Sequence, residues 1–107
     1  MERGEIVRLT APRRARGHEQ QGSRPGVVVQ ADELLALSTV LVAPTSRSAM
    51  PATFRPLVEI SGVTTRVLTD QLRVFDAQTL KSGFGRLAPE DLEALDEALA
   101  LVLGLRV

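Results

Sequence analysis

Apolar positions along the 107-residue chain fall into short stretches rich in β-branched residues, a pattern typical of strands. Alternation over residues 5–9 predicts a first strand, and continuous apolar runs predict buried strands at 25–30 and 39–44. Two further strands are predicted at 56–60 and 65–74, the last of them with room for a bulge. We expect one or two helical turns within 31–37 and a loop over 46–55.

One helix is predicted near the end of the sequence, over about residues 89–103. Pro89 suits the first helical position, and the acidic residues that follow it lie where the helix dipole favours negative charge. Gly104 then suits the residue just beyond the helix. An apolar stripe recurs at helical spacing, formed by Leu92, Leu95, Leu99 and Val102. Strands over roughly 5–75 and this helix predict a mainly β fold: one domain over 1–107, a small barrel with a helix packed on it.

Composition narrows the function classes. With 44% hydrophobic residues the chain has enough apolar surface to fold, which excludes a disordered protein. There is no Cys and only one His, so we expect no disulfide, no metal site and no cofactor. No apolar run approaches the roughly 18 residues that span a bilayer, and the first residues do not resemble a signal peptide. These features predict a cytoplasmic protein that does not bind membranes.

Charge is unevenly distributed although the formal net charge is zero. Residues 1–24 contain six Arg and three Glu, whereas residues 88–107 contain five acidic groups and one Arg. A local basic site is therefore compatible with the neutral total, although simple variation in surface charge explains the same pattern. The sequence GHEQQGSRP at 17–25 joins the first two predicted strands, and it is either a solvated turn or a functional loop.

Several segments resemble, in order, the MazF/PemK toxin family, especially its Kid-like branch. They are MERGEI at 1–6, GHEQQGSRP at 17–25 with VVV at 27–29, VAPTS at 42–46, DQLRVFD at 70–76 and GRLAPE at 85–90. Three positions depart from the family pattern: Pro44 directly precedes Thr45, Ala88 replaces a capping Ser, and Leu68 replaces an Arg. The resemblance implies the SH3-like barrel of MazF, Kid and CcdB.

The resemblance also implies the toxin of a type II toxin–antitoxin system. Such a toxin is a sequence-specific, metal-independent endoribonuclease (mRNA interferase) that cuts single-stranded RNA. The ribose 2′-hydroxyl attacks the adjacent phosphate and leaves a cyclic phosphate and a 5′-hydroxyl. This reaction needs a base for the 2′ proton, an acid for the leaving oxygen and a fixed cation at the phosphate.

Five catalytic candidates follow from the resemblance. Arg24 would hold the phosphate, because its guanidinium is a permanently charged planar fork of donors. Thr45 would donate to a phosphate oxygen or help the leaving group, and alternatively it bonds nearby backbone. Asp70 would take the 2′ proton. His18 would be acid, base or stabiliser, or else a surface residue, since its ordinary pKa lies near neutrality. Glu19 is a further candidate base, or it pins the loop.

Leu68 leaves the general acid open, because it stands where the Kid-like branch has an Arg two residues before the Asp. Arg66 lies two residues further back, on the same face of a regular strand, and is the candidate substitute. Recognition of RNA is expected to use arginines and base-edge hydrogen bonds, since only three residues are aromatic and two of them, Phe75 and Phe84, are expected in the core. The RNA-binding candidates, each alternatively part of a solvated basic face, are Arg13, Arg14, Arg16, Ser46, Arg47, Arg55 and Arg66.

The partners implied are single-stranded RNA, a second copy of the chain and a MazE-like antitoxin with an acidic, disordered tail. The segments 70–75 and 84–87 are the candidate dimer interface. One alternative is a CcdB-like DNA gyrase poison, which shares the barrel but depends on a terminal Trp-Gly-Ile, whereas this sequence has no Trp and ends in Leu-Arg-Val. The other alternative is a non-catalytic SH3-like binding module.

Overall fold

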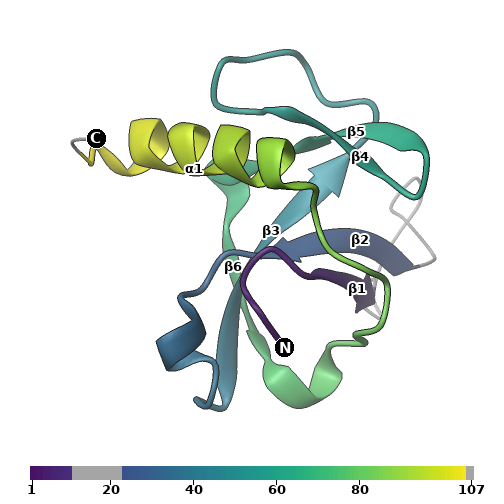
Figure 1. Cartoon of the computed structure of the whole chain (residues 1–107), viewed down its shortest axis with the longest axis vertical. Helices are drawn as coiled ribbons and strands as arrows, with labels where there is room; N and C mark the ends of the chain where they lie inside the picture. Colours follow the sequence, from purple (N-terminus) through teal and green to yellow (C-terminus); the bar gives the residue numbers. More distant parts are fainter. Residues whose placement is uncertain (11–22, 106–107) are drawn as a thin grey trace, which may run out of the picture.

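The computed structural model describes residues 1–10 and 23–105, and its scaffold is a bent antiparallel sheet (Figure 1). The strands are β1 (Ile6–Thr10), β2 (Ser23–Val28), β3 (Thr39–Ser46), β4 (Leu57–Ile60), β5 (Val63–Val67) and β6 (Arg73–Asp76). They are followed by one helix, α1 (Pro89–Leu103), and interrupted by the short 3-10 turns η1 (Asp32–Leu34), η2 (Thr69–Gln71) and η3 (Ala77–Thr79). The expectation of a mainly β fold with a terminal helix is confirmed.

β3 is the central strand, and it bends the sheet by pairing with different strands along its length. One of its edges pairs with β2, while its other edge pairs first with β6, from Thr39 to Val42, and then with β5, at Thr45 and Ser46. The single strand expected over 65–74 is therefore wrong: β5 ends at Val67, η2 turns the chain, and β6 begins at Arg73. Because β5 and β6 pair with different parts of the same edge of β3, the chain must turn away from that edge between the two strands.

The two faces of the sheet bury two separate apolar clusters, as alternation of side chains along strands requires. Ile6, Val27 and Ala43 point to the face on which α1 packs with Leu95 and Leu99. Val7, Val28 and Val42 point to the opposite face. Gly26 lies where β2 is closest to its neighbours, because a Cβ there would come within 2.8 Å of both Leu9 and Val42.

α1 begins and ends as its sequence predicts. Pro89 is in the first turn, Ala88 offers no side-chain cap, and Gly104 ends the helix in the left-handed conformation at φ 68°. The helix buries Leu95, Ala98 and Leu99, whereas Val102, expected in the apolar stripe, is exposed. An ion pair of 2.7 Å between Arg3 and Asp96 fastens the helix to the start of the chain.

Two aromatic side chains were expected in the core, and only one of them packs there. Phe75 is partly buried against the second cluster. Phe84 is 40% exposed, so this prediction is wrong for it. It lies in the irregular segment between η3 and α1, where no strand or helix period fixes the direction of a side chain. In the described part of the chain, no helix is long and apolar enough to cross a membrane.

Candidate active site

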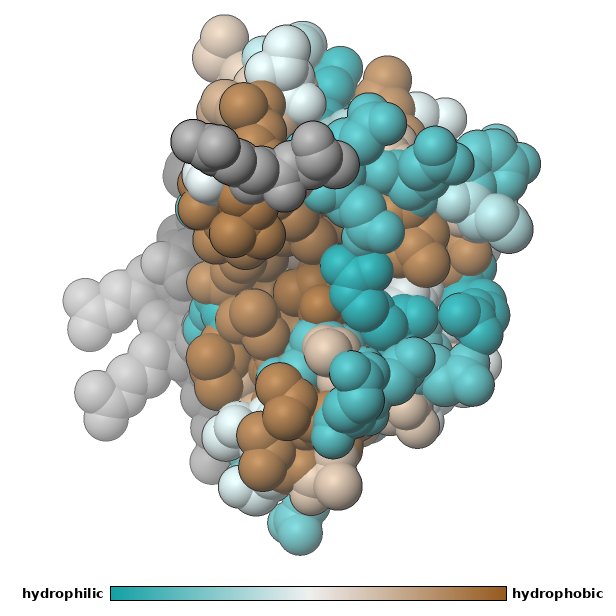
Figure 2. Space-filling view, turned by 60° about the vertical axis from the view of Figure 1, so that its left-hand side comes forward, coloured by the Kyte–Doolittle hydropathy of each residue, from teal (hydrophilic) through white to brown (hydrophobic). Residues whose placement is uncertain are grey.

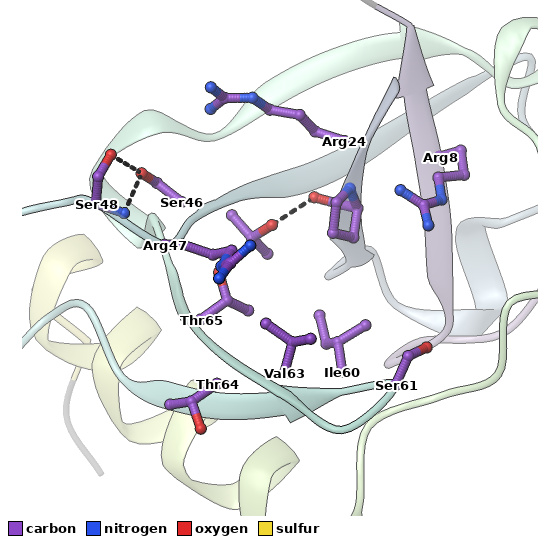
Figure 3. A pocket seen from close by; sticks show the side chains of 12 residues that line it. Arg8, Arg24, Ser46, Arg47, Ser48, Ile60, Ser61, Val63, Thr64 and Thr65 are labelled. Atoms are coloured by element: carbon purple, nitrogen blue, oxygen red, sulfur yellow. Dashed lines mark hydrogen bonds between the residues drawn. The ribbon is translucent and has the colours of Figure 1, made fainter. Parts of the chain in front are cut away.

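An open groove of about 750 Å³ lies at one end of the bent sheet (Figure 3). Its lining comes from β1, the start of β2, the end of β3 and the hairpin of β4 and β5. Four of the lining residues lie two positions along their strands from a residue of the first apolar cluster, and so face the same way. These residues are Arg8 after Ile6, Pro25 before Val27, Thr45 after Ala43, and Thr65 before Val67. The groove is where that face changes from apolar to polar.

Arg24 and Thr45, the two leading catalytic candidates, both line this groove. Arg24 lies on β2 opposite Leu9 of β1, and Pro25 follows it in the strand. The Thr45 side chain is almost fully buried, at 3% exposure, and its hydroxyl donates a 2.7 Å hydrogen bond to the carbonyl oxygen of Pro25. In this state the Thr45 hydroxyl can accept from a ligand. To donate to one, it would have to give up the bond to Pro25.

The last residue of β3 and the two residues after it form a second wall of the groove. Ser46, Arg47 and Ser48 line it, and the Ser46 hydroxyl accepts a 3.3 Å bond from the backbone amide of Ser48. The two serine hydroxyls also lie 3.5 Å apart. Figure 3 shows the Arg47 side chain reaching toward the middle of the groove from this turn. Two of the expected RNA-binding residues, Ser46 and Arg47, thus lie beside Arg24 and Thr45.

Arg8 is a groove residue that the sequence analysis missed. Its guanidinium carbon lies 5.2 Å from the ring centre of the exposed Phe84, within the range of cation–π contact. The signal was present in the sequence: Arg8 is polar in an apolar strand, two residues from Ile6, which makes it point to the same face as that core residue. A charged side chain there marks the place where the core ends.

Three arginines therefore meet at the groove without a carboxylate partner among the described residues. The ion pairs found in residues 1–10 and 23–105 involve Arg3, Arg55 and Arg86 instead. Arg8, Arg24 and Arg47 give the groove a local positive charge in a chain whose formal net charge is zero. Such a site attracts an anion, and the guanidinium fork matches a phosphate.

Thr65 adds an unsatisfied hydroxyl to the same surface. The residue lines the groove and is only 4% exposed, and its Oγ1 atom is the buried side-chain oxygen for which the described residues supply no hydrogen-bond partner. Leaving a buried hydroxyl without a partner costs roughly 1–3 kcal/mol. The groove therefore has one polar atom that gains from a ligand or from water.

Asp70, the candidate base, lies outside the lining of the groove, in η2, and contacts Arg55. Arg55 donates to both carboxylate oxygens, from Nε at 3.1 Å and from a terminal nitrogen at 2.8 Å. This hydrogen bonding holds the pKa of the Asp70 carboxyl below its ordinary value, against an opposing effect of desolvation, and raises the pKa of Arg55. Arg66, the candidate substitute for the missing Arg, donates to the Arg55 carbonyl oxygen at 2.9 Å.

The remaining candidates divide into two groups. Arg55 and Arg66, expected to bind RNA, contact Asp70 and backbone and do not line the groove. Leu68, where the family has an Arg, is buried, and its amide donates to the Pro44 carbonyl oxygen at 2.8 Å. The candidates that lie outside the described residues are Arg13, Arg14, Arg16, His18 and Glu19.

A different surface of the molecule is apolar. Figure 2 looks at the side of the molecule where α1 ends and shows a broad apolar area. Leu41, Leu72 and Leu103 line a cavity of about 280 Å³ between β3 and α1. Beside it Val74 is 65% exposed, and Leu101 and Leu105 are also exposed. An area of this kind marks an interaction surface more often than a free one.

Comparison with known proteins identifies the family. The family model of the PemK-like, MazF-like toxins of type II toxin–antitoxin systems matches residues 2–103. A candidate toxin of Mycobacterium tuberculosis is 38% identical over 104 residues, which cover 96% of this chain and 97% of the relative.

Solved structures show the same fold. An endoribonuclease from a mycobacterial species, solved with its cognate antitoxin, has a TM-score of 0.81 at 19% identity, over 100% of this chain and 98% of that one. MazF from Deinococcus radiodurans has a TM-score of 0.75 at 23% identity, over 98% of this chain and 97% of that one. The match to the family model and the mycobacterial relative lead to one conclusion: the chain belongs to the PemK-like, MazF-like toxins of type II toxin–antitoxin systems.

Proposed function

We propose that this toxin is an endoribonuclease that cuts single-stranded RNA in the cytoplasm, at specific sequences and without a metal ion. The observation on which this proposal rests is the shared groove of Arg24 and Thr45, with Arg8 and Arg47 beside them. A permanent cation next to a hydroxyl and two further cations suits a phosphodiester that gains negative charge as it is attacked. Arg24 is assigned as the group that holds the scissile phosphate.

The proposed reaction is the one that the resemblance to the family implies. The 2′-oxygen attacks the adjacent phosphorus, the 2′ proton passes to a base, and the 5′-oxygen leaves with a proton from an acid. The products are a 2′,3′-cyclic phosphate and a 5′-hydroxyl. Arg24 stabilises the phosphorane-like charge, and removal of such a preorganised donor typically costs about 10²–10³ in rate. Positioned acid and base groups would each contribute roughly 10²–10⁴.

The partners follow from the two surfaces. An antitoxin with an acidic, disordered tail suits a groove with three arginines, and it would exclude RNA by covering the same cations. A second copy of the chain suits the apolar area formed by Leu72, Val74 and the end of α1. Sedimentation analysis tests the second point: a homodimer gives twice the 11.6 kDa of one chain, and a monomer at micromolar concentration contradicts it.

Cleavage of a labelled single-stranded RNA in excess EDTA tests the activity. The proposal expects defined products with cyclic phosphate and 5′-hydroxyl ends, and Arg24→Ala is expected to lower the rate at least about a hundredfold. Lys81→Ala is the control, because Lys81 is an exposed cation outside the lining of the groove and outside the candidate dimer segments 70–75 and 84–87. Intact RNA together with stalled DNA gyrase would support a CcdB-like poison. Binding of RNA without any cleavage would indicate a non-catalytic module.

A further inference from the structure

The loop between β3 and β4 is bonded at its far end to η2. Arg55 contacts Asp70 through two hydrogen bonds and also donates to the Met50 carbonyl oxygen at 3.2 Å. The Thr69 hydroxyl donates to the Phe54 carbonyl oxygen, and the Arg66 guanidinium donates to that of Arg55. We call Arg55, Arg66, Thr69 and Asp70 the loop anchor. It holds residues 50–55 against the turn that separates β5 from β6.

The same loop begins in the groove. Ser46, Arg47 and Ser48 line the groove, and only Ala49 separates them from the anchored segment, residues 50–55. Ser46 also lies opposite Arg66 in the pairing of β3 with β5. Both ends of the loop are thus fixed, one by the pairing of β3 with β5 and the other by bonds to Arg66 of β5 and to η2. Movement at the anchored end would change where Arg47 and Ser48 stand.

Asp70 contacts Arg55 through both of its carboxylate oxygens. Each of its carboxylate oxygens accepts a hydrogen bond from Arg55, and its side chain is 29% exposed against 19% for Arg55. A general base works best when its pKa lies near the working pH, and the contact with Arg55 holds the pKa of Asp70 on the low side instead. Two hydrogen bonds to one guanidinium fix the relative positions of Asp70 and Arg55, and they leave the carboxylate a weaker proton acceptor.

We propose that Asp70 in this chain is a positioning residue that acts through Arg55 to hold the wall of the groove formed by Ser46, Arg47 and Ser48. The inference rests on the proposed function, because that wall has a role only if the groove binds RNA. It separates this chain from its family pattern, in which the equivalent Asp lies two residues after an Arg. Here that position is the buried Leu68, and Arg55 supplies the guanidinium from the loop.

Steady-state kinetics with a short single-stranded RNA between pH 5 and 9 separate a positioning residue from a base. Asp70→Asn and Arg55→Gln should each raise KM roughly three- to tenfold and leave kcat and its pH profile close to those of the wild type. The KM of the double variant should be no higher than that of the more impaired single variant, because both changes break the same contact. Asp76→Asn is the matched control, because Asp76 accepts from the Gln78 amide in η3 and is remote from the loop.

Two results with the single variants would overturn the proposal. One is a kcat at least about a hundredfold lower in Asp70→Asn, with a changed pH profile and a normal Arg55→Gln variant, which would make Asp70 the base. The other is a pair of single variants that are both indistinguishable from wild type. Exchange of the two side chains, Arg55→Asp with Asp70→Arg, should recover part of the lost affinity, and a result worse than either single change would also count against the pair.

Hydrogen exchange keeps this test separate from the test of the proposed function. If the wild-type chain leaves RNA intact, the proposed function is wrong, and amide exchange over residues 47–55 then decides the positioning role alone. Faster exchange over this loop in Asp70→Asn and Arg55→Gln, with unchanged exchange in β3 and in Asp76→Asn, is the result that we expect. Unchanged exchange over the loop would overturn the inference whether or not the protein cuts RNA.

Discussion

Arginines occupy two regions near the same end of the sheet, and they differ in what their guanidinium groups contact. In the groove, Arg8, Arg24 and Arg47 form no ion pair with any residue that the structure describes. In the loop anchor, Arg55 is paired with Asp70 and Arg66 donates to backbone. From the sequence alone, Arg47, Arg55 and Arg66 were all predicted to bind RNA.

The difference shows that the partners of an arginine indicate its role better than its charge does. A guanidinium that faces an open groove keeps its donors available, and a phosphate can take them without breaking an existing contact. A guanidinium that already donates two hydrogen bonds to a carboxylate, as Arg55 does, would first have to lose that ion pair. Arg55 therefore serves the geometry of the loop, whereas Arg24 is available for a ligand.

A carboxylate introduced into the groove should give its arginines an acidic partner, as Arg55 has in the loop anchor. Of the changes considered, this one should have the largest effect on activity. Ser48→Asp places an acid beside Arg24 and Arg47, where it competes with the phosphate and repels it. The expected loss in kcat/KM is roughly tenfold or more, since juxtaposed like charges cost several kcal/mol when buried and less in an open groove. Ser48→Asn is the neutral control of similar size. Equal activity of the two variants would contradict a role for this wall in binding RNA.

The salt dependence of RNA binding should also differ between the two groups of arginines, with a moderate effect. For single-stranded nucleic acid, each phosphate contact contributes about 0.7 to the slope of log affinity against log salt concentration. Arg8→Gln and Arg47→Gln should each reduce the magnitude of this slope by about that amount, whereas Arg66→Gln should leave it unchanged. Fluorescence anisotropy of an RNA in which the attacking 2′-hydroxyl is replaced measures the binding. A reduced slope in Arg66→Gln would place the loop anchor in the RNA-binding surface.

Two buried threonines allow the same comparison for hydroxyl groups. Thr65, in the groove, has no partner for its Oγ1 atom among the described residues, whereas Thr69, in the loop anchor, donates to the Phe54 carbonyl oxygen. Thr65→Val should therefore stabilise the protein by about 1 kcal/mol and Thr69→Val should destabilise it by a similar amount. In thermal unfolding, each change corresponds to a shift of roughly 5 °C, upward for the first variant and downward for the second. A lower Tm for Thr65→Val would mean that its hydroxyl has a partner after all.

Much of the fold is set by local patterns that a sequence displays. Alternation and β-branched runs predicted the positions of β1 to β4, and Pro89 with Gly104 predicted the extent of α1. The division of residues 63–76 into β5, η2 and β6 was not predicted, because no Gly or Pro marks the turn at Thr69–Gln71. That turn exists because β3 pairs with both strands along one edge, which is a property of the whole sheet.

The groove was only partly predictable, for the same reason. Arg8 could have been identified from its two-residue spacing to Ile6, because strand periodicity alone gives its face. The contact between Arg55 and Asp70 joins residues fifteen positions apart, and it depends on the path of a loop for which the sequence has no period. Resemblance to the family indicated a role for Asp70, but the arginine that holds it comes from a segment outside the matched motifs.

The smallest of these effects is expected from acid, which should weaken the contact between Arg55 and Asp70 in the loop anchor. The pKa of Asp70 is lowered in the folded protein by its bonds to Arg55. The stabilisation that these bonds give is therefore complete above the ordinary aspartate pKa of about 4. It is lost as the pH falls through the lower pKa of the folded state. In urea unfolding, wild type should exceed Asp70→Asn in midpoint at pH 6, and the gap should close in stronger acid. Glu93→Gln, an exposed change on α1, is the control. Because the Arg55–Asp70 pair is partly exposed, solvent screening keeps the difference between the two unfolding midpoints small. A difference that persists unchanged in strong acid would mean that Asp70 contributes by its shape and not by its charge.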